Sequence, residues 1–270
     1  MNITVIIPVH EYNEVIKGYL DKAIESIVKQ EGVELPKVII VAPQEVLVNV
    51  VPVISLETHP NLSYVANEGD TSYQSQVNLA VKSVTTDYFS VLEFDDEFGT
   101  TYFKNVENYI KSYPEIDVFL SMMIEVNEKN EGIKLTNETV WAQQFVGENG
   151  EMGYLNVNSL KQYTDFKLSG AIIKKSEFLN LGGYKTNIKL TFMYEFLLRT
   201  LNNASKVYTI PKIGYKHFAT RDGSLFDSYL KTMPVEERKF WFETATKESN
   251  FMNDRPIDLS RLQKVVFEEK

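Results

Sequence analysis

Four carboxylates lie within the five positions from Glu93 to Glu97, directly after a run of apolar residues. They belong to Glu93, Asp95, Asp96 and Glu97. Carboxylates this close repel one another unless a cation lies among them, and oxygen ligands suit hard dications such as Mg²⁺ and Mn²⁺. The alternative interpretation is an acidic, solvated turn, which is the more common meaning of an acidic run. The segment is therefore a candidate metal site whose interpretation depends on the elements around it.

Short β-branched runs alternate with segments of helical periodicity along the first third of the chain. This pattern predicts βαβ units and a mostly parallel sheet. The predicted strands cover residues 3–8, 37–42, 62–66 and 88–92, and the predicted helices cover residues 16–28 and 73–84. In open α/β sheets, ligands bind beyond the carboxyl ends of the strands. The acidic segment follows the fourth predicted strand and so lies where a ligand is expected.

Composition limits the remaining classes of function. The 270 residues are 43% hydrophobic and 12% aromatic, which is enough for one main domain with an appendage. A net charge of -9 argues against a broad nucleic-acid surface, and the absence of cysteine excludes disulfides, a thiolate nucleophile and a cysteine-type zinc site. No dinucleotide, P-loop, zinc-protease or serine-hydrolase motif occurs. No apolar run is long enough to form a transmembrane segment, so we expect a soluble, cytoplasmic protein.

Two regions depart from the regular pattern. Residues 127–165 are irregular and rich in Gly, Asn and Glu, and an insert of this length in a compact domain is usually functional or mobile. The last segment, from about Phe226 to the end, carries Trp241 and other aromatics in a charged setting. We expect it to form a helical extension that packs on the core or mediates a homo-oligomer.

Several short motifs occur in a fixed order along residues 1–225. They are Ile3–Val9 with the helix that ends at Gln30, Asn67-x-Gly69, Asn78-x-Ala80, Asp87-Tyr88, Glu93-x-Asp95-Asp96, Ser169-Gly170-Ala171 and Leu181-Gly182-Gly183-Tyr184. Together they resemble the family 2 glycosyltransferases of the GT-A fold. The resemblance implies a mostly parallel central sheet flanked by helices in residues 1–225. The expected helical C-terminal extension covers residues 226–270.

The resemblance also implies an activity. This is the metal-dependent, inverting transfer of a sugar from a nucleoside-diphosphate sugar to a hydroxyl on a glycan, lipid, protein or modified nucleobase. A UDP-sugar is the expected donor, although Ala42–Gln44 replace the acidic residues that read the base in the family. The implied cofactor is Mn²⁺ or Mg²⁺, which would neutralise charge on the departing diphosphate.

The implied metal ligands are Asp95 and His217. Glu93 is expected near the ribose, and Asp96 is expected to support the metal as a catalytic residue or second ligand. Imidazole tolerates Mn²⁺ and would fill a coordination position that carboxylates leave open. The alternative for His217 is a structural histidine beside an aromatic residue, and the neighbouring Lys216 and Arg221 could simply meet phosphate charge.

Two loops are expected to bind the donor. After the first strand, the family resemblance implicates four consecutive residues, Pro8, Val9, His10 and Glu11. After the third strand it implicates Asn67 and Gly69, where glycine permits close backbone approach to a ligand. The alternative for the second loop is an ordinary turn.

An inverting transfer needs a general base, and the family supplies an acidic residue six or seven positions before a helical arginine. Counting back from Arg199 leads to Phe192 and Met193, neither of which accepts a proton. Glu195 is the nearest carboxylate and our predicted base, with Asp165 as a second candidate. Glu195 is equally explained as the i,i+4 helix partner of Arg199. The alternative function is therefore a nucleotide-sugar or glycan-binding module that has lost the base.

Overall fold

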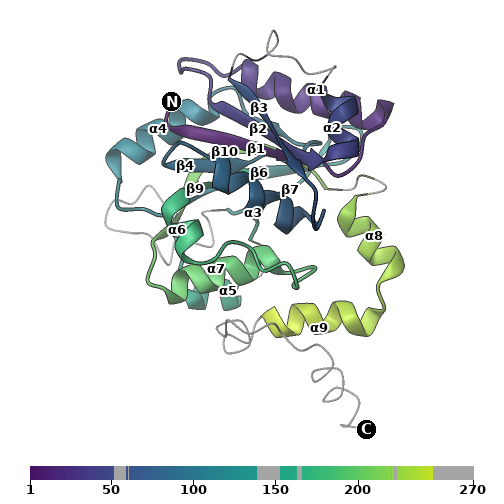
Figure 1. Cartoon of the computed structure of the whole chain (residues 1–270). Helices are drawn as coiled ribbons and strands as arrows, with labels where there is room; N and C mark the ends of the chain where they lie inside the picture. The colour runs from purple at the N-terminus through teal and green to yellow at the C-terminus, as the bar shows by residue number, and fades with distance from the viewer. Residues whose placement is uncertain are drawn as a thin grey trace.

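The computed structural model describes residues 1–51, 59, 61–138, 153–162, 166–219, 221 and 224–245. These form one ten-stranded sheet with helices on both faces (Figure 1). The strands are β1 (Ile3–Pro8), β2 (Lys37–Pro43), β3 (Leu62–Asn67), β4 (Tyr88–Val91), β5 (Glu97–Phe98), β6 (Val118–Val126), β7 (Gly132–Thr136), β8 (Gly153–Tyr154), β9 (Ile172–Lys174) and β10 (Val207–Phe218). The helices are α1 (Glu14–Val28), α2 (Gln44–Val50), α3 (Tyr73–Ser83), α4 (Tyr102–Ser112), α5 (Val157–Gln162), α6 (Lys175–Asn180), α7 (Phe192–Asn202), α8 (Leu225–Thr232) and α9 (Val235–Ala245).

The first half of the sheet is parallel. Strand β1 pairs in parallel with β2 and with β4, and β2 pairs in parallel with β3. All six residues of β1 are buried, as expected for a strand covered on both faces. The loops that follow β1, β3 and β4 therefore leave the sheet at the same edge.

The second half of the sheet is mixed. The order along the sheet is β3-β2-β1-β4-β9-β6-β10-β5, with β7 beside β6 and β8 beside β10. Strand β9 is antiparallel to both β4 and β6, whereas β6 and β10 are parallel. The short strand β5 pairs with the end of β10, with Lys216 opposite Glu97. This pairing brings the end of β10 to the acidic segment.

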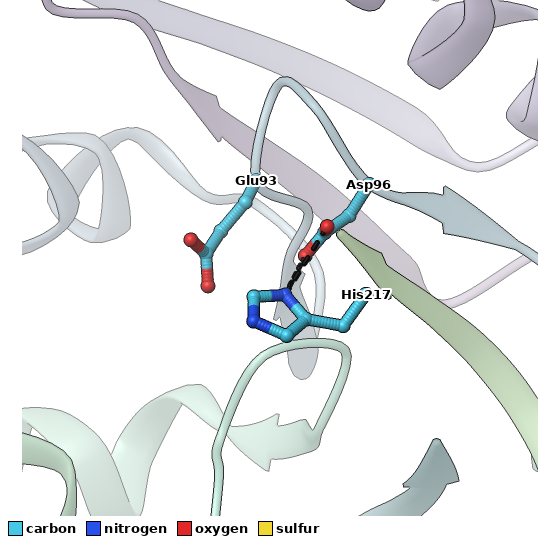
Figure 2. A group of neighbouring side chains, drawn as sticks. All are labelled: Glu93, Asp96 and His217. Atoms are coloured by element: carbon cyan, nitrogen blue, oxygen red, sulfur yellow. Dashed lines mark hydrogen bonds and ion pairs between the residues drawn. The ribbon is translucent and has the colours of Figure 1, made fainter. Parts of the chain in front are cut away.

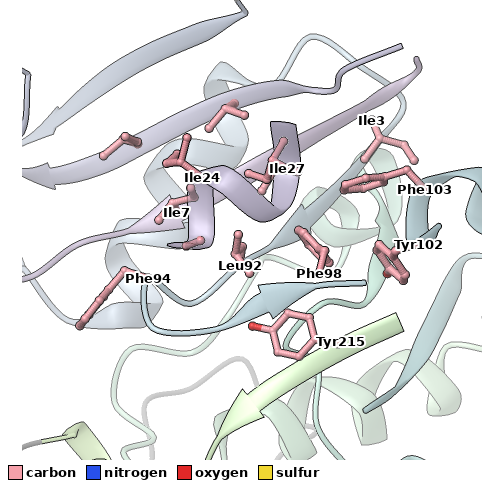
Figure 3. Close-up of a cluster of buried hydrophobic side chains, with 14 of the residues drawn as sticks. Ile3, Ile7, Ile24, Ile27, Leu92, Phe94, Phe98, Tyr102, Phe103 and Tyr215 are labelled. Carbon is pink, nitrogen blue, oxygen red and sulfur yellow. The ribbon is translucent and has the colours of Figure 1, made fainter. Parts of the chain in front are cut away.

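The core has two parts, one on each face of the sheet. Helices α1, α2 and α4 bury their apolar side chains on one face, and α3, α5, α6 and α7 do so on the other. Figure 3 shows Ile24 and Ile27 of α1 against Ile7 of β1. Helix α1 begins at a cap in which Asn13 accepts hydrogen bonds from two backbone amides, and its buried residues recur every three or four positions. The helices thus cover both faces of the sheet, and the loops that follow β1, β3 and β4 lie at its edge.

The predicted strands and helices of the first 92 residues are confirmed, with bounds that shift by one or two residues. The helices α2 and α4 were not expected. The interval 127–165, expected to be irregular, contains β7, β8 and α5, while residues 139–152 and 163–165 lie outside the described ranges. Trp241 is fully buried in the same core cluster as the apolar residues of α7. Of the two expectations for the C-terminal segment, Trp241 therefore follows the one in which the segment packs on the core.

Among the described residues, no helix combines the length and hydropathy needed to cross a bilayer.

Candidate functional site

The acidic segment forms a tight turn beyond β4. Leu92 continues the pairing with β1, because its amide donates to the carbonyl of Ile6 at 2.9 Å. The amide of Asp96 then donates to the carbonyl of Glu93 at 3.0 Å, which closes the turn before β5. Phe94 is buried in the core between these residues. The turn therefore has an apolar anchor, and its carboxylates are held at the sheet edge.

Asp96 is the centre of the site and is fully buried. Its Oδ1 accepts the backbone amide of Phe218 at 2.9 Å, and its Oδ2 accepts the Tyr215 hydroxyl at 2.7 Å. His217 Nδ1 lies 2.9 Å from Oδ2. Because the carboxylate is an acceptor, Nδ1 carries the proton of this bond and Nε2 faces away from Asp96. Asp96 thus orients the imidazole, as a carboxylate does behind a metal-binding histidine.

Glu93 completes a group of three potential ligands. One ligand atom from each of Glu93, Asp96 and His217 lies within 4.8 Å of the others, and the imidazole lies between the two carboxylates (Figure 2). The Glu93 carboxylate accepts a hydrogen bond from the Ser169 hydroxyl, and its backbone amide donates to the Tyr215 hydroxyl at 3.2 Å. The group joins the β4–β5 turn, the end of β10 and the segment before β9.

The two carboxylates of this group favour the protonated form of the His217 imidazole. Burial alone would lower the pKa of His217, but the charge and hydrogen bond of Asp96, together with the charge of Glu93, raise it to about 9. Burial and the charge of Asp96 raise the pKa of Glu93, and His217 opposes this shift. The imidazole is therefore cationic at neutral pH and offsets part of the negative charge.

The motif Ser169-Gly170-Ala171 supplies the wall beside Glu93. Gly170 has φ of +68°, and a Cβ atom there would lie 2.2 Å from Tyr215 Cδ2. Only glycine adopts this backbone conformation freely while allowing the ring to approach so closely. Gly170 thus permits the placement of Tyr215, whose hydroxyl contacts both acidic residues of the group.

Asp95 lies apart from this group and is paired with Arg221. Arg221 Nε donates to Asp95 Oδ2 at 2.5 Å, and both side chains are about nine-tenths buried, at 11% and 10% exposed. The guanidinium carbon lies 5.1 Å from the centre of the Phe94 ring and 5.8 Å from that of Tyr19. Burial and the charge of Glu93 raise the pKa of Asp95, and Arg221 opposes the shift. The predicted metal ligand Asp95 is thus held by an internal cation.

The predicted donor loops lie at the same sheet edge. Pro8 ends β1, and Val9 is buried with its amide bonded to the carbonyl of Val41. His10 packs 5.4 Å from Phe94 between ring centres, and its Nε2 lies 3.5 Å from Glu11. Burial and the charge of Arg221 lower the pKa of His10, against the influence of Glu11. His10 therefore borders the turn that carries the acidic group, and Glu11 contacts His10.

Asn67 and Gly69 form a turn after β3. The Asn67 side chain donates to the carbonyl of Asp70 at 2.7 Å and accepts the amide of Gly69 at 3.0 Å. These contacts match the turn alternative. Donor binding by this loop stays a prediction.

Glu195 is fully buried in an ion pair within α7. Its Oε1 accepts Arg199 Nε at 2.7 Å and its Oε2 accepts Arg199 Nη2 at 2.8 Å, while Lys185 Nζ lies 3.4 Å away. Arg199 also donates to the carbonyls of Leu181 and Gly183. The structure therefore contains the i,i+4 ion pair that was the alternative role for Glu195. Arg199 of this pair also joins the Leu181–Tyr184 motif to α7. The second candidate base, Asp165, lies outside the described residues.

Tyr215 is a residue of the site that was not predicted from the sequence. Residues two apart on a strand point to the same face, so Tyr215 and His217 share a face of β10. That spacing is the signal in the sequence. Its meaning depends on the pairing of β10 with β5, which the local pattern does not reveal.

A scan against protein-family models and a search of curated proteins found no match. Among solved structures, the chain is similar to S. aureus TarS 1-349 in complex with UDP-GlcNAc, with a TM-score of 0.65 and 17% identity over 92% of this chain and 66% of that chain. The complex of TarS 1-349 with UDP gives 0.62, with 15% identity over 89% of this chain and 78% of that chain. The chain has the GT-A fold. It spans 66% of the TarS 1-349 chain solved with UDP-GlcNAc, which is just under two thirds. It spans 50% of the chain in a TarS structure that is not limited to residues 1–349. The GT-A expectation is confirmed, and the fold alone does not define an activity.

Proposed function

We propose that this chain is an inverting glycosyltransferase that transfers a sugar from a UDP-sugar to an acceptor hydroxyl. The observation that carries the proposal is the group formed by Glu93, Asp96 and His217 at the carboxyl edge of the parallel strands. Ligands of open α/β sheets bind at this edge. The likeness to TarS structures solved with UDP-GlcNAc and with UDP supports the choice of donor. The acceptor is a hydroxyl of a glycan, a lipid, a protein or a modified nucleobase.

The donor set of the group fits Mn²⁺ or Mg²⁺. Carboxylate oxygens suit both ions, and an imidazole nitrogen suits Mn²⁺ in addition. Glu93 and His217 Nε2 are the proposed ligands, with Asp96 orienting the imidazole. Asp95 joins them only when Arg221 leaves its carboxylate. When bound, a dication supplies positive charge to the departing diphosphate.

The chain's own cations act at the same place. His217 is protonated at neutral pH and must lose its Nε2 proton to become a metal ligand, so metal affinity should rise with pH. Arg221 neutralises Asp95 in the structure, and its release would free both a carboxylate and a guanidinium. The freed guanidinium can then donate hydrogen bonds to a diphosphate, and the freed carboxylate can bind the dication.

The proposed transfer also needs a general base. Both oxygens of Glu195 are bonded to Arg199, so Glu195 could accept a proton only after leaving that partner. Glu195 and Asp165 stay predictions for this role. The ion pair of Glu195 favours the second candidate function, a module that binds a nucleotide sugar or glycan without turning it over.

Hydrolysis of UDP-GlcNAc in the presence of Mn²⁺ tests the proposal without requiring the acceptor. We expect slow release of UDP by the native chain, and loss of this release in His217→Gln and Glu93→Gln. Asp21→Asn, which alters an exposed helix ion pair, is the matched control and should retain full activity. Binding of UDP-GlcNAc without release of UDP, with or without sugar acceptors, would instead support the binding module.

A further inference from the structure

Asn137 forms a clamp at the point where the chain leaves β7. It is 2% exposed, and all of its side-chain bonding atoms are used. Its Nδ2 donates to the carbonyls of Ser121 and Lys167 at 2.9 Å each, and its Oδ1 accepts the amide of Lys167 at 3.1 Å. Its φ of 57° lies in the left-handed region, which asparagine tolerates better than most residues. The amide thus joins β6 to the backbone of a residue thirty positions away.

Lys167 has a second tie to β6 through its side chain. Its Nζ lies 2.8 Å from Oε1 of Glu125, a residue of β6 that is 4% exposed. The Thr136 hydroxyl donates to the same oxygen at 2.6 Å. Burial alone would raise the pKa of Glu125, but the hydrogen bonds of Lys167 and Thr136 outweigh it and lower the pKa. Backbone and side chain of Lys167 are therefore both fixed to the same strand.

The clamp leads directly to Glu93. Ser169, two residues after Lys167, donates its hydroxyl to the Glu93 carboxylate. The turn around Ser169 is closed by the amide of Ala171 on the carbonyl of Leu168 at 3.0 Å, and the amide of Gly170 donates to the carbonyl of Val91 at 2.9 Å. One end of the turn is thus held by β4, and the other end is held by Asn137.

We propose that Asn137 is a positioning residue that holds the Lys167–Ala171 turn so that Ser169 fixes the Glu93 carboxylate in its ligand-binding orientation. Asn137 acts through Ser169 and does not itself contact the ligand. The inference rests on the proposed function for the identity of that ligand, a nucleoside diphosphate with a dication. The positioning itself can be tested without any ligand.

The first test is hydrogen exchange on the free protein. Asn137→Gly keeps the left-handed backbone available but removes all three side-chain bonds. Asn130→Gly is the matched control, because Asn130 also has positive φ (61°) and lies in the β6–β7 turn, away from the clamp. We expect the amides of Gly170 and Ala171 to exchange about five- to tenfold faster in Asn137→Gly than in Asn130→Gly, as for the loss of one or more hydrogen bonds. Equal exchange in the two variants would overturn the positioning role.

The second test measures the affinity for UDP with Mn²⁺ by calorimetry. Residues that orient a metal ligand typically change affinity about ten- to a hundredfold when removed. We expect a loss in this range for Asn137→Gly and for Ser169→Ala, native affinity in Asn130→Gly, and no further loss in the double variant Asn137→Gly/Ser169→Ala. Native affinity in Asn137→Gly, or losses that multiply in the double variant, would overturn the inference. Failure of the native chain to bind UDP, with faster exchange in Asn137→Gly, would overturn the proposed function and leave the positioning of the turn established.

Discussion

Replacing Glu195 by glutamine separates the structural role of this residue from its predicted catalytic role. In Glu195→Gln, the new side chain would still offer one oxygen to Arg199 Nε, but its amide nitrogen would face Arg199 Nη2, where Oε2 of the native glutamate accepts at 2.8 Å. Arg199, 13% exposed, would be left as a poorly compensated buried cation. Breaking a buried ion pair costs about 3–5 kcal/mol, and the carbonyls of Leu181 and Gly183 still accept from Arg199, so we expect about 3 kcal/mol.

Thermal and urea unfolding followed by circular dichroism measure this cost. A loss of about 3 kcal/mol corresponds to a fall in melting temperature on the order of 10 °C for a chain of this size. Asp21→Asn is the control, since it removes an i,i+4 pair whose side chains are 35% and 48% exposed and should cost only about 0.3–0.5 kcal/mol. A melting temperature for Glu195→Gln equal to that of Asp21→Asn would refute the structural reasoning. If turnover were abolished in that stable variant, Glu195 would be the base.

Two further perturbations test the site. Gly170→Ala should displace the Tyr215 ring and destabilise the protein by about 2 kcal/mol more than the control Gly182→Ala. Both glycines have positive φ, but nothing lies within 4 Å of a Cβ atom at Gly182. Equal unfolding free energies of the two variants would contradict the close packing of Gly170 on Tyr215. In His217→Gln, the loss of stability relative to the native chain should be greatest below about pH 6.5 and should shrink as the pH rises through about 9. The sign follows from the raised pKa of His217, whose ion pair with Asp96 stabilises the fold only while the imidazole is protonated. Unfolding curves at pH 6 and pH 10 check this, and a difference that does not change with pH would show that the imidazole is not charged in the fold.

The elements of the first half could be predicted from the sequence because their signals are local. The buried run of β1, the spacing of Ile16, Leu20 and Ile27 in α1, and the acidic turn after β4 each lie within one short window. The parallel order then follows from the βαβ pattern, and it places the acidic turn at the ligand edge.

The partners of the acidic residues could not be predicted in this way. The pairing of β10 with β5 brings His217 to Asp96 across 121 positions, and Arg221 meets Asp95 across 126. These contacts depend on the antiparallel register of a two-residue strand, which carries almost no signal of its own. Glu195 shows a different limit, because a base and an i,i+4 ion-pair partner have the same local spacing.

Metal binding at the acidic turn can be measured by a titration of Mn²⁺ followed by electron paramagnetic resonance, with and without UDP. We predict that the native chain with UDP removes more free Mn²⁺ from solution than the same concentration of UDP alone, and that His217→Gln and Glu93→Gln weaken this additional binding at least about tenfold. Free Mn²⁺ equal to that with UDP alone, or native binding in both variants, would contradict the claim that these two residues hold a dication for a nucleoside diphosphate.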